Sequence, residues 1–98
     1  MTAEQVIPYC AEHGYGIETV FNQVHIKGKY ERWYFEECSD PNSKVRLMHE
    51  NRTGNGWHEQ FREHISPALL VRYIYEHETA KFEHFTDFHV GNDGRPRM

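Results

Sequence analysis

The stretch that decides the fold is VHIKGKYERWYFE, residues 24–36. Apolar and polar side chains alternate on both sides of the Gly28-Lys29 pair, which is suited to a tight turn. Such a period of two places successive side chains on opposite faces of a strand. The stretch therefore predicts two antiparallel strands joined by that turn. One face of the pair is apolar: Val24, Ile26, Trp33 and Phe35.

The alternation continues on either side of this hairpin. Upstream, a first strand is predicted from residue 17 to Lys27, because the segment is rich in β-branched residues. An amphipathic helix is the alternative there, since four residues have its spacing: Ile17, Val20, Phe21 and Val24. Downstream, the second strand covers residues 30–37, turn-forming residues fill 39–43, and a third strand covers residues 44–51. These segments predict a three-stranded antiparallel meander.

Helices are predicted at both ends of the meander. Thr2 and Gln5 have the spacing of a capping box, so a helix is expected over residues 3–13. Ser66 followed by Pro67 is typical of a second helix start, and this helix is expected to end between residues 84 and 88. Its apolar stripe is Val71, Ile74, Tyr75, Glu78, Phe82 and Phe85. A short helical turn is expected around residues 57–64.

Together these elements predict an α+β fold in a single domain. An N-terminal helix, a three-stranded antiparallel meander and a long C-terminal helix follow one another (αβββα), with the last helix packed on one face of the sheet. A chain of 98 residues has room for one core. The domain is expected over residues 1–89, and residues 90–98 are expected to be a disordered tail.

Composition disfavours several classes of protein. The longest aliphatic run covers residues 68–71, far short of the roughly 20 residues of a membrane span. The first residues lack the basic and apolar segments of a secretory signal. Cys10 and Cys38 are too few for a disulfide framework, so a cytoplasmic location is predicted. A formal net charge of −4 disfavours a partner held through phosphate contacts.

The sequence carries no motif for catalysis or for a cofactor. Cys10 and His13 have the spacing of half a zinc site, which Cys38 and His49 could complete. However, the predicted strand register sets His49 opposite Trp33, about 16 Å along the sheet from Cys38. That separation is too large for one ion. The prediction is no metal, no cofactor and no catalytic residue, with a binding protein favoured over an enzyme.

Two groups of residues are candidates for a binding interface. One is a set of rings expected to reach past the end of the sheet: Phe82, Phe85 and Phe88. The other mixes aromatic and arginine side chains on the predicted outer face of the sheet: Phe21, His25, Arg32, Tyr34, Arg46 and Met48. Glu78 belongs to the apolar stripe of the second helix by its spacing. Its carboxylate is expected at the rim of that stripe, where it would pair with Arg32 or Arg46.

These candidates favour a small cytosolic protein-binding or regulatory module, with a homodimer as one form of it. The alternative is a nucleic-acid-binding module that uses the outer face of the sheet, where rings could stack on bases. A small enzyme or metalloprotein is the third hypothesis.

Overall fold

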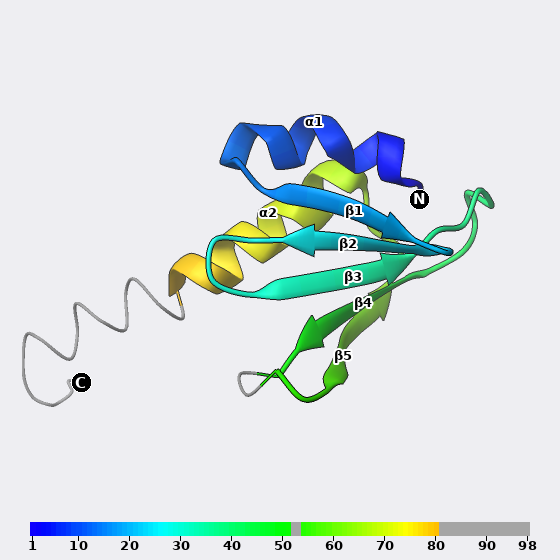
Figure 1. Ribbon diagram of the computed structural model, residues 1–98. Coiled ribbons are helices and arrows are strands. Elements are labelled where there is room, and N and C mark those ends of the chain that lie inside the picture. Colours follow the sequence, from blue (N-terminus) through cyan, green and yellow to red (C-terminus); the bar gives the residue numbers. More distant parts are fainter. Residues whose placement is uncertain (52–53, 81–98) are drawn as a thin grey trace, which may run out of the picture.

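The computed structural model describes residues 1–51 and 54–80 of the chain (Figure 1). The elements, in chain order, are α1 (Ala3–His13), β1 (Gly16–Val20), β2 (Gln23–Lys27), β3 (Arg32–Glu36), β4 (Val45–Glu50), β5 (Trp57–Glu63) and α2 (Pro67–Glu78). The strands form one antiparallel sheet in the order β1-β2-β3-β4-β5. The predicted α+β class and the predicted order of helix, antiparallel strands and helix are confirmed, but the sheet has five strands instead of three.

One additional strand comes from the segment predicted as a single strand up to Lys27. It contains β1 and β2, which are joined by a turn at Phe21 and Asn22 and paired from Val20↔Gln23 to Gly16↔Lys27. Turns of this length usually carry glycine or asparagine at the residue of positive φ. Here that residue is Phe21, with a φ of 56°. The sequence therefore lacks the glycine that would have marked the turn.

The other additional strand is β5, in the segment predicted as a helical turn around residues 57–64. Leu47 pairs with Phe61 and Met48 with Glu59, so Gln60 is an extra residue in β5 and forms a bulge. A bulge shifts the alternation of side chains by one position along the strand. The period of two is therefore interrupted within β5, and the sequence pattern does not indicate a strand there.

Both helices begin as predicted. The side chain of Gln5 accepts a hydrogen bond from the Thr2 N–H at 2.9 Å ahead of α1, and Gly14 ends that helix at a φ of 73°. The Ser66 hydroxyl accepts a hydrogen bond from the Leu69 N–H ahead of α2. Within the described residues, helix α2 has the bounds Pro67–Glu78. The predicted end between residues 84 and 88 and the predicted tail over 90–98 lie outside the described residues.

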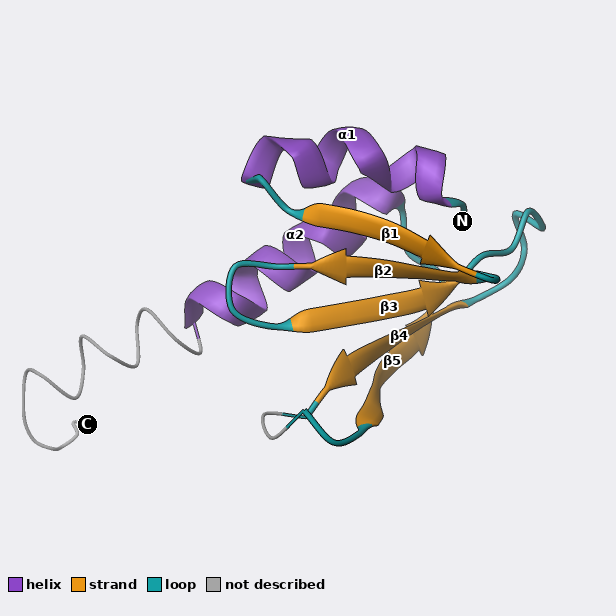
Figure 2. Ribbon diagram, in the orientation of Figure 1, coloured by secondary structure: helices purple, strands orange, loops and turns teal. Residues whose placement is uncertain are grey.

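The two helices lie on the same side of the sheet, and its other face is not covered by either (Figure 2). The hydrophobic core between them consists of Val6, Cys10, Val24, Ile26, Trp33, Phe35, Val45, Leu47, Leu70, Val71 and Ile74. Within residues 1–51 and 54–80, no helix is long and apolar enough to cross a membrane. The sheet thus has a covered face and an open face, and each carries a candidate site.

Candidate functional site

The open face of the sheet is defined by the side chains that alternate with the buried ones on β2, β3 and β4. At its centre His25 stacks on Tyr34, with ring centroids 5.0 Å apart. Trp57 of β5 meets both rings edge-on, at 5.7 Å from His25 and 4.8 Å from Tyr34. His25 and Tyr34 stand side by side because they are in register on the adjacent strands β2 and β3, and Trp57 reaches them from β5, across β4.

Charged side chains surround these rings in both signs. The cations on the open face are Lys27, Arg32, Arg46 and Arg62, and the anions are Glu18, Glu36, Glu50 and Glu59. Glu59 pairs with two arginines, Arg46 at 2.8 Å and Arg62 at 3.2 Å. The hydrogen bond from Arg46 lowers the pKa of the Glu59 carboxyl. The face is therefore balanced in charge, unlike the chain as a whole.

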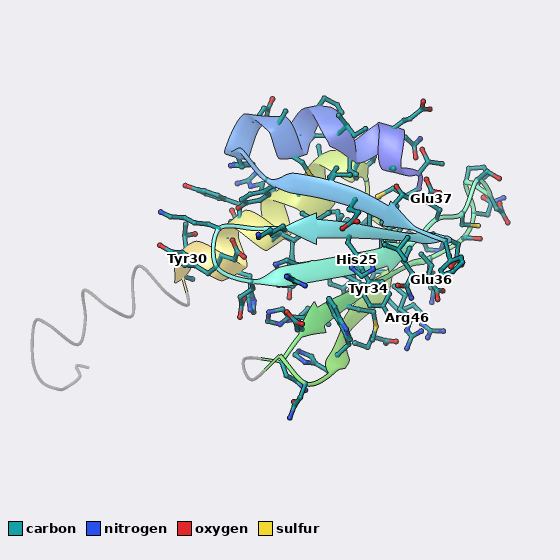
Figure 3. The ribbon with its side chains drawn as sticks, in the orientation of Figure 1. His25, Tyr30, Tyr34, Glu36, Glu37 and Arg46 are labelled. Carbon is teal, nitrogen blue, oxygen red and sulfur yellow. The ribbon has the colours of Figure 1, made fainter. Side chains whose placement is uncertain are left out.

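The interface candidates on the strands lie where the alternation placed them. Figure 3 shows His25, Tyr34 and Arg46 on the same side of the sheet. Arg32 lies there as well, 4.0 Å from Glu50, with 61% of its side chain exposed. Met48 points the same way but is only 7% exposed, so it supports its neighbours and offers little surface. The candidates Phe82, Phe85 and Phe88 lie outside the described residues.

Phe21 occupies a different position from the one expected. It is located at the tip of the β1–β2 hairpin instead of within a strand, and it is 96% exposed. Its φ of 56° lies in the left-handed region, which bulky residues rarely adopt. Phe21 is therefore unfavourable in this position on two counts, its exposure and its backbone conformation.

A hollow of about 310 Å³ lies at the other end of the same hairpin. Its lining combines side chains of the open face with the apolar residues beside them: Gly16, Ile17, Glu18, His25, Ile26, Lys27 and Arg32. Gly16 contributes no side chain, and a Cβ at that position would meet only Lys27 Cβ, at 3.7 Å. The size of the hollow is at the lower end of the range for ligand pockets.

The covered face holds Glu78, which is 1% exposed. Its carboxylate accepts hydrogen bonds from three successive backbone N–H groups of the β2–β3 loop, Lys29 at 2.9 Å, Tyr30 at 3.4 Å and Glu31 at 2.8 Å. Trp33 Nε1 donates a fourth at 3.4 Å. The expected pairing with Arg32 or Arg46 is wrong, because both arginines lie on the opposite face. Backbone amides stabilise the buried charge instead.

We call this arrangement the Glu78 latch, and two more residues depend on it. A Cβ at Gly28 would lie within 2.7 Å of three carboxyl atoms of Glu78, so any larger residue there would displace the carboxylate from its hydrogen bonds. The Tyr15 side chain lies close enough to Glu78 to feel its charge. Burial, followed by the nearby Glu78 charge, raises the pKa of Tyr15 to about 12. The latch thus joins the end of α2 to the β2–β3 loop and to Tyr15.

Beside the latch, three ionisable side chains converge from three elements. Glu31 lies in the β2–β3 loop, His49 on β4 and His77 on α2, and one ligand atom of each lies within 4.8 Å of the other two. Glu31 Oε1 is 2.8 Å from His49 Nε2 and 3.9 Å from His77 Nε2. We call this group the Glu31–His49–His77 cluster. It contains an oxygen and two imidazole nitrogens, donors that suit a transition-metal ion.

The cluster is buried and closely packed. The His49 ring stacks on Trp33 with centroids 4.0 Å apart, and it is 2% exposed. Burial lowers the pKa of His49, while the neighbouring Glu31 opposes that shift. The His49 imidazole is therefore held in its neutral form, the form in which a ring nitrogen can bind a metal.

Sequence reasoning missed this cluster, although two signals pointed to it. Glu31 lies two residues before Trp33, so the alternation directs both side chains to the covered face. The predicted pairing of His49 with Trp33 is confirmed. His77 follows Ile74 at helical spacing on the buried side of α2. The three residues are 18 and 28 positions apart along the chain, so no local pattern indicates that they converge.

The cysteines lie apart from this cluster. Cys10 is buried in the core, and burial raises the pKa of its thiol to about 11. The Cys38 thiol hydrogen-bonds with the Ser43 hydroxyl, which lowers its pKa. A thiolate at Cys10 is thus disfavoured at neutral pH. Of the four residues weighed from the sequence as zinc ligands, only His49 belongs to the cluster of possible metal ligands found within the described residues.

Comparison with protein-family models, with curated proteins and with solved structures finds no match to this chain.

Proposed function

We propose that the protein is a protein-binding module that associates with a second copy of itself through the open face of its sheet. The observation that carries this proposal is Phe21, which is 96% exposed at a φ of 56°. A left-handed conformation costs an L-residue about 1–2 kcal/mol, and an exposed ring gains nothing from the core. A partner that buries the ring would explain why such a residue is present.

The open face offers a place for that ring on a second copy. Phe21 and the hollow beside Gly16 lie at opposite ends of the β1–β2 hairpin. Two copies whose hairpins run side by side in opposite directions would each bring Phe21 to the hollow of the other. A twofold interface requires this reciprocity, because each contact between the two copies occurs twice.

The charges on the open face support the same partner. The basic side chains (arginine and lysine) on this face equal the glutamates in number. A second copy related by a twofold axis can therefore place its cations opposite these anions. The rings of His25, Tyr34 and Trp57 lie between these charges, and aromatic and arginine side chains are enriched in protein interfaces. The proposal includes a regulatory role and a cytoplasmic location. The free thiols of Cys10 and Cys38 support that location, because they suit a reducing compartment.

The proposal is tested by the oligomeric state of three variants in sedimentation velocity over a dilution series. Phe21→Asn removes the ring and places a residue that tolerates positive φ in the turn. Gly16→Leu fills the hollow at a position where an added Cβ meets only Lys27 Cβ, at 3.7 Å. Leu69→Ala is the matched control, because it removes another exposed apolar side chain, one on α2.

The wild type and Leu69→Ala should dimerise, whereas Phe21→Asn and Gly16→Leu should sediment as monomers. Phe21→Asn should also keep or raise the free energy of unfolding, by up to about 1 kcal/mol, because it relieves the turn. A gain in stability with a loss of association separates an interface residue from a structural one. A wild-type chain that stays monomeric up to its solubility limit would overturn the proposal.

A nucleic-acid partner is the second candidate, and the stacked rings of His25 and Tyr34 are the observation that favours it. The glutamates on the same face oppose it, because they repel phosphates. It predicts retention of single-stranded probes at low salt, lost in Arg32→Ala and Tyr34→Ala. Retention by a monomeric wild type would replace the proposed function with this one.

A further inference from the structure

The Glu31–His49–His77 cluster lies on the covered face, apart from the surface of the proposed function. Its members are far apart in sequence and reach one point only because β4, α2 and the β2–β3 loop pack together. The carboxylate oxygen of Glu31 faces Nε2 of both histidines, at 2.8 Å from His49 and 3.9 Å from His77. Three donor atoms thus converge on one volume.

His49 provides an independent indication of a ligand. Its ring is 2% exposed, and its Nε2 atom, aimed into the cluster, makes no hydrogen bond with the described part of the chain. The Glu31 oxygen lies 2.8 Å away, within ion-pair distance, but this contact is not a hydrogen bond of good geometry. A buried polar atom without a hydrogen bond is costly, and native proteins rarely keep one without a reason.

We propose that Glu31, His49 and His77 form a binding site for a divalent transition-metal ion, with zinc as the preferred one. Two imidazoles and one carboxylate form a common ligand set for zinc. Bonds of about 2.0–2.1 Å in a tetrahedral arrangement hold ligand atoms about 3.3 Å apart. The Glu31 oxygen lies 2.8 and 3.9 Å from the two imidazole nitrogens, and all three atoms lie within 4.8 Å of one another, so the ligands would move closer together around the ion.

The surroundings hold the ligands in place before the ion binds. The backbone N–H of Glu31 donates to Glu78, which fixes the loop that carries the carboxylate. Trp33 stacks on the His49 ring and meets the His77 ring edge-on. Such support restricts the orientation of each ligand, as the groups behind metal ligands do in other proteins.

Among residues 1–51 and 54–80, three side chains form this ligand set, and a fourth position is left for water. The nearby His58 is not available as a ligand, because its two ring nitrogens hydrogen-bond with Asn51 and Gln60. His77 keeps 24% of its side chain exposed, so solvent reaches the cluster from the side of α2. Three protein ligands and a position accessible to water form the arrangement of catalytic zinc sites, whereas structural sites have four protein ligands.

The test is zinc binding to the full chain, without a histidine tag, by equilibrium dialysis and by titration with Co²⁺ followed by visible absorption. The wild type should bind one zinc ion per chain. His77→Gln and Glu31→Gln should each weaken binding at least ~100-fold, since even the loss of a group behind a ligand costs 10–100-fold. His64→Ala, which removes an exposed imidazole beyond β5, is the matched control and should bind as the wild type does.

His77→Gln and Glu31→Gln keep the approximate shape of each side chain, and circular dichroism checks that both variants are folded. His49→Ala is avoided as the main test, because it leaves a cavity against Trp33. A folded wild type that binds no stoichiometric zinc overturns the proposal. The same conclusion follows if both cluster variants retain wild-type affinity, or if Ca²⁺ or Mg²⁺ binds in preference to zinc.

Discussion

Polar side chains are buried on one face of the sheet and exposed on the other. On the covered face, Glu78 is 1% exposed and His49 is 2% exposed, and each is held by groups from other elements. On the open face, Arg46 and Glu59 are well exposed and form their ion pair on adjacent strands of a hairpin. A buried charge depends on the whole fold, whereas an exposed pair depends on its neighbours and on solvent.

This difference teaches where the stability of the domain is concentrated. A carboxylate removed from water is destabilising unless several donors compensate for the lost hydration, so each donor of the Glu78 latch is needed. An exposed pair already has water as an alternative partner. Substitutions on the two faces should therefore differ several-fold in their effect on the free energy of unfolding.

The largest effect is expected at the Glu78 latch. Glu78→Gln replaces an oxygen acceptor by an amide donor that faces backbone N–H groups, and Gly28→Ala places a Cβ within 2.7 Å of three carboxyl atoms. Each should lower the free energy of unfolding by about 3 kcal/mol, measured by urea denaturation. Gly16→Ala is the matched control, since its Cβ meets only Lys27 at 3.7 Å.

The double variant Gly28→Ala with Glu78→Gln should lose less than the sum of the two single losses. Both substitutions break the same contacts, and such neighbours are not additive. Additive losses would show that Gly28 and Glu78 act separately, which would contradict the latch.

An intermediate effect is expected from Tyr15 at alkaline pH. Burial and the nearby Glu78 raise the pKa of Tyr15 from 10.0 to about 12 in the folded chain. The folded state therefore favours the protonated phenol. This contribution to stability is fully present below pH 10 and is lost as the pH rises through about 12.

The free energy of unfolding of the wild type should fall between those pH values, and the fall should be smaller in Tyr15→Phe. Absorbance of the phenolate gives the titration directly, because the latest-titrating tyrosine should disappear in that variant. An unchanged titration in Tyr15→Phe would mean that another tyrosine has the raised pKa.

The smallest effect is expected on the open face. Arg46→Gln breaks the pair with Glu59, whose side chain is 40% exposed, and should lower the free energy of unfolding by less than about 0.5 kcal/mol. The effect should shrink further at high salt. A loss as large as that of Glu78→Gln would remove the contrast between the two faces.

The sequence was most informative where side chains alternate without interruption. The pairing of Trp33 with His49, the α+β class and the starts of both helices could be predicted, because each depends on a local pattern. The turn at Phe21 was missed because its residue contradicts its backbone conformation, and β5 was missed because Gln60 interrupts the alternation.

The candidate sites were predictable to different degrees for the same reason. Strand parity placed Arg32, Tyr34 and Arg46 on one face, so the open face could be outlined from the sequence. The partners of Glu78 are backbone N–H groups, which every residue but proline carries, so no residue type indicates them. Contacts of this kind emerge only when the helix and the loop are seen together.

The Glu78 latch also bears on the order in which the chain becomes complete during synthesis. Each strand of the meander pairs with the next one along the chain, but Glu78 bonds to residues 45 to 49 positions before it. A ribosome releases the five strands before it releases the end of α2. Until then the amides of the β2–β3 loop and the indole of Trp33 lack their acceptor, and of the two helices only α1 covers the apolar face of the nascent sheet. The nascent chain therefore stays prone to aggregation until the last turn of α2 has been synthesised.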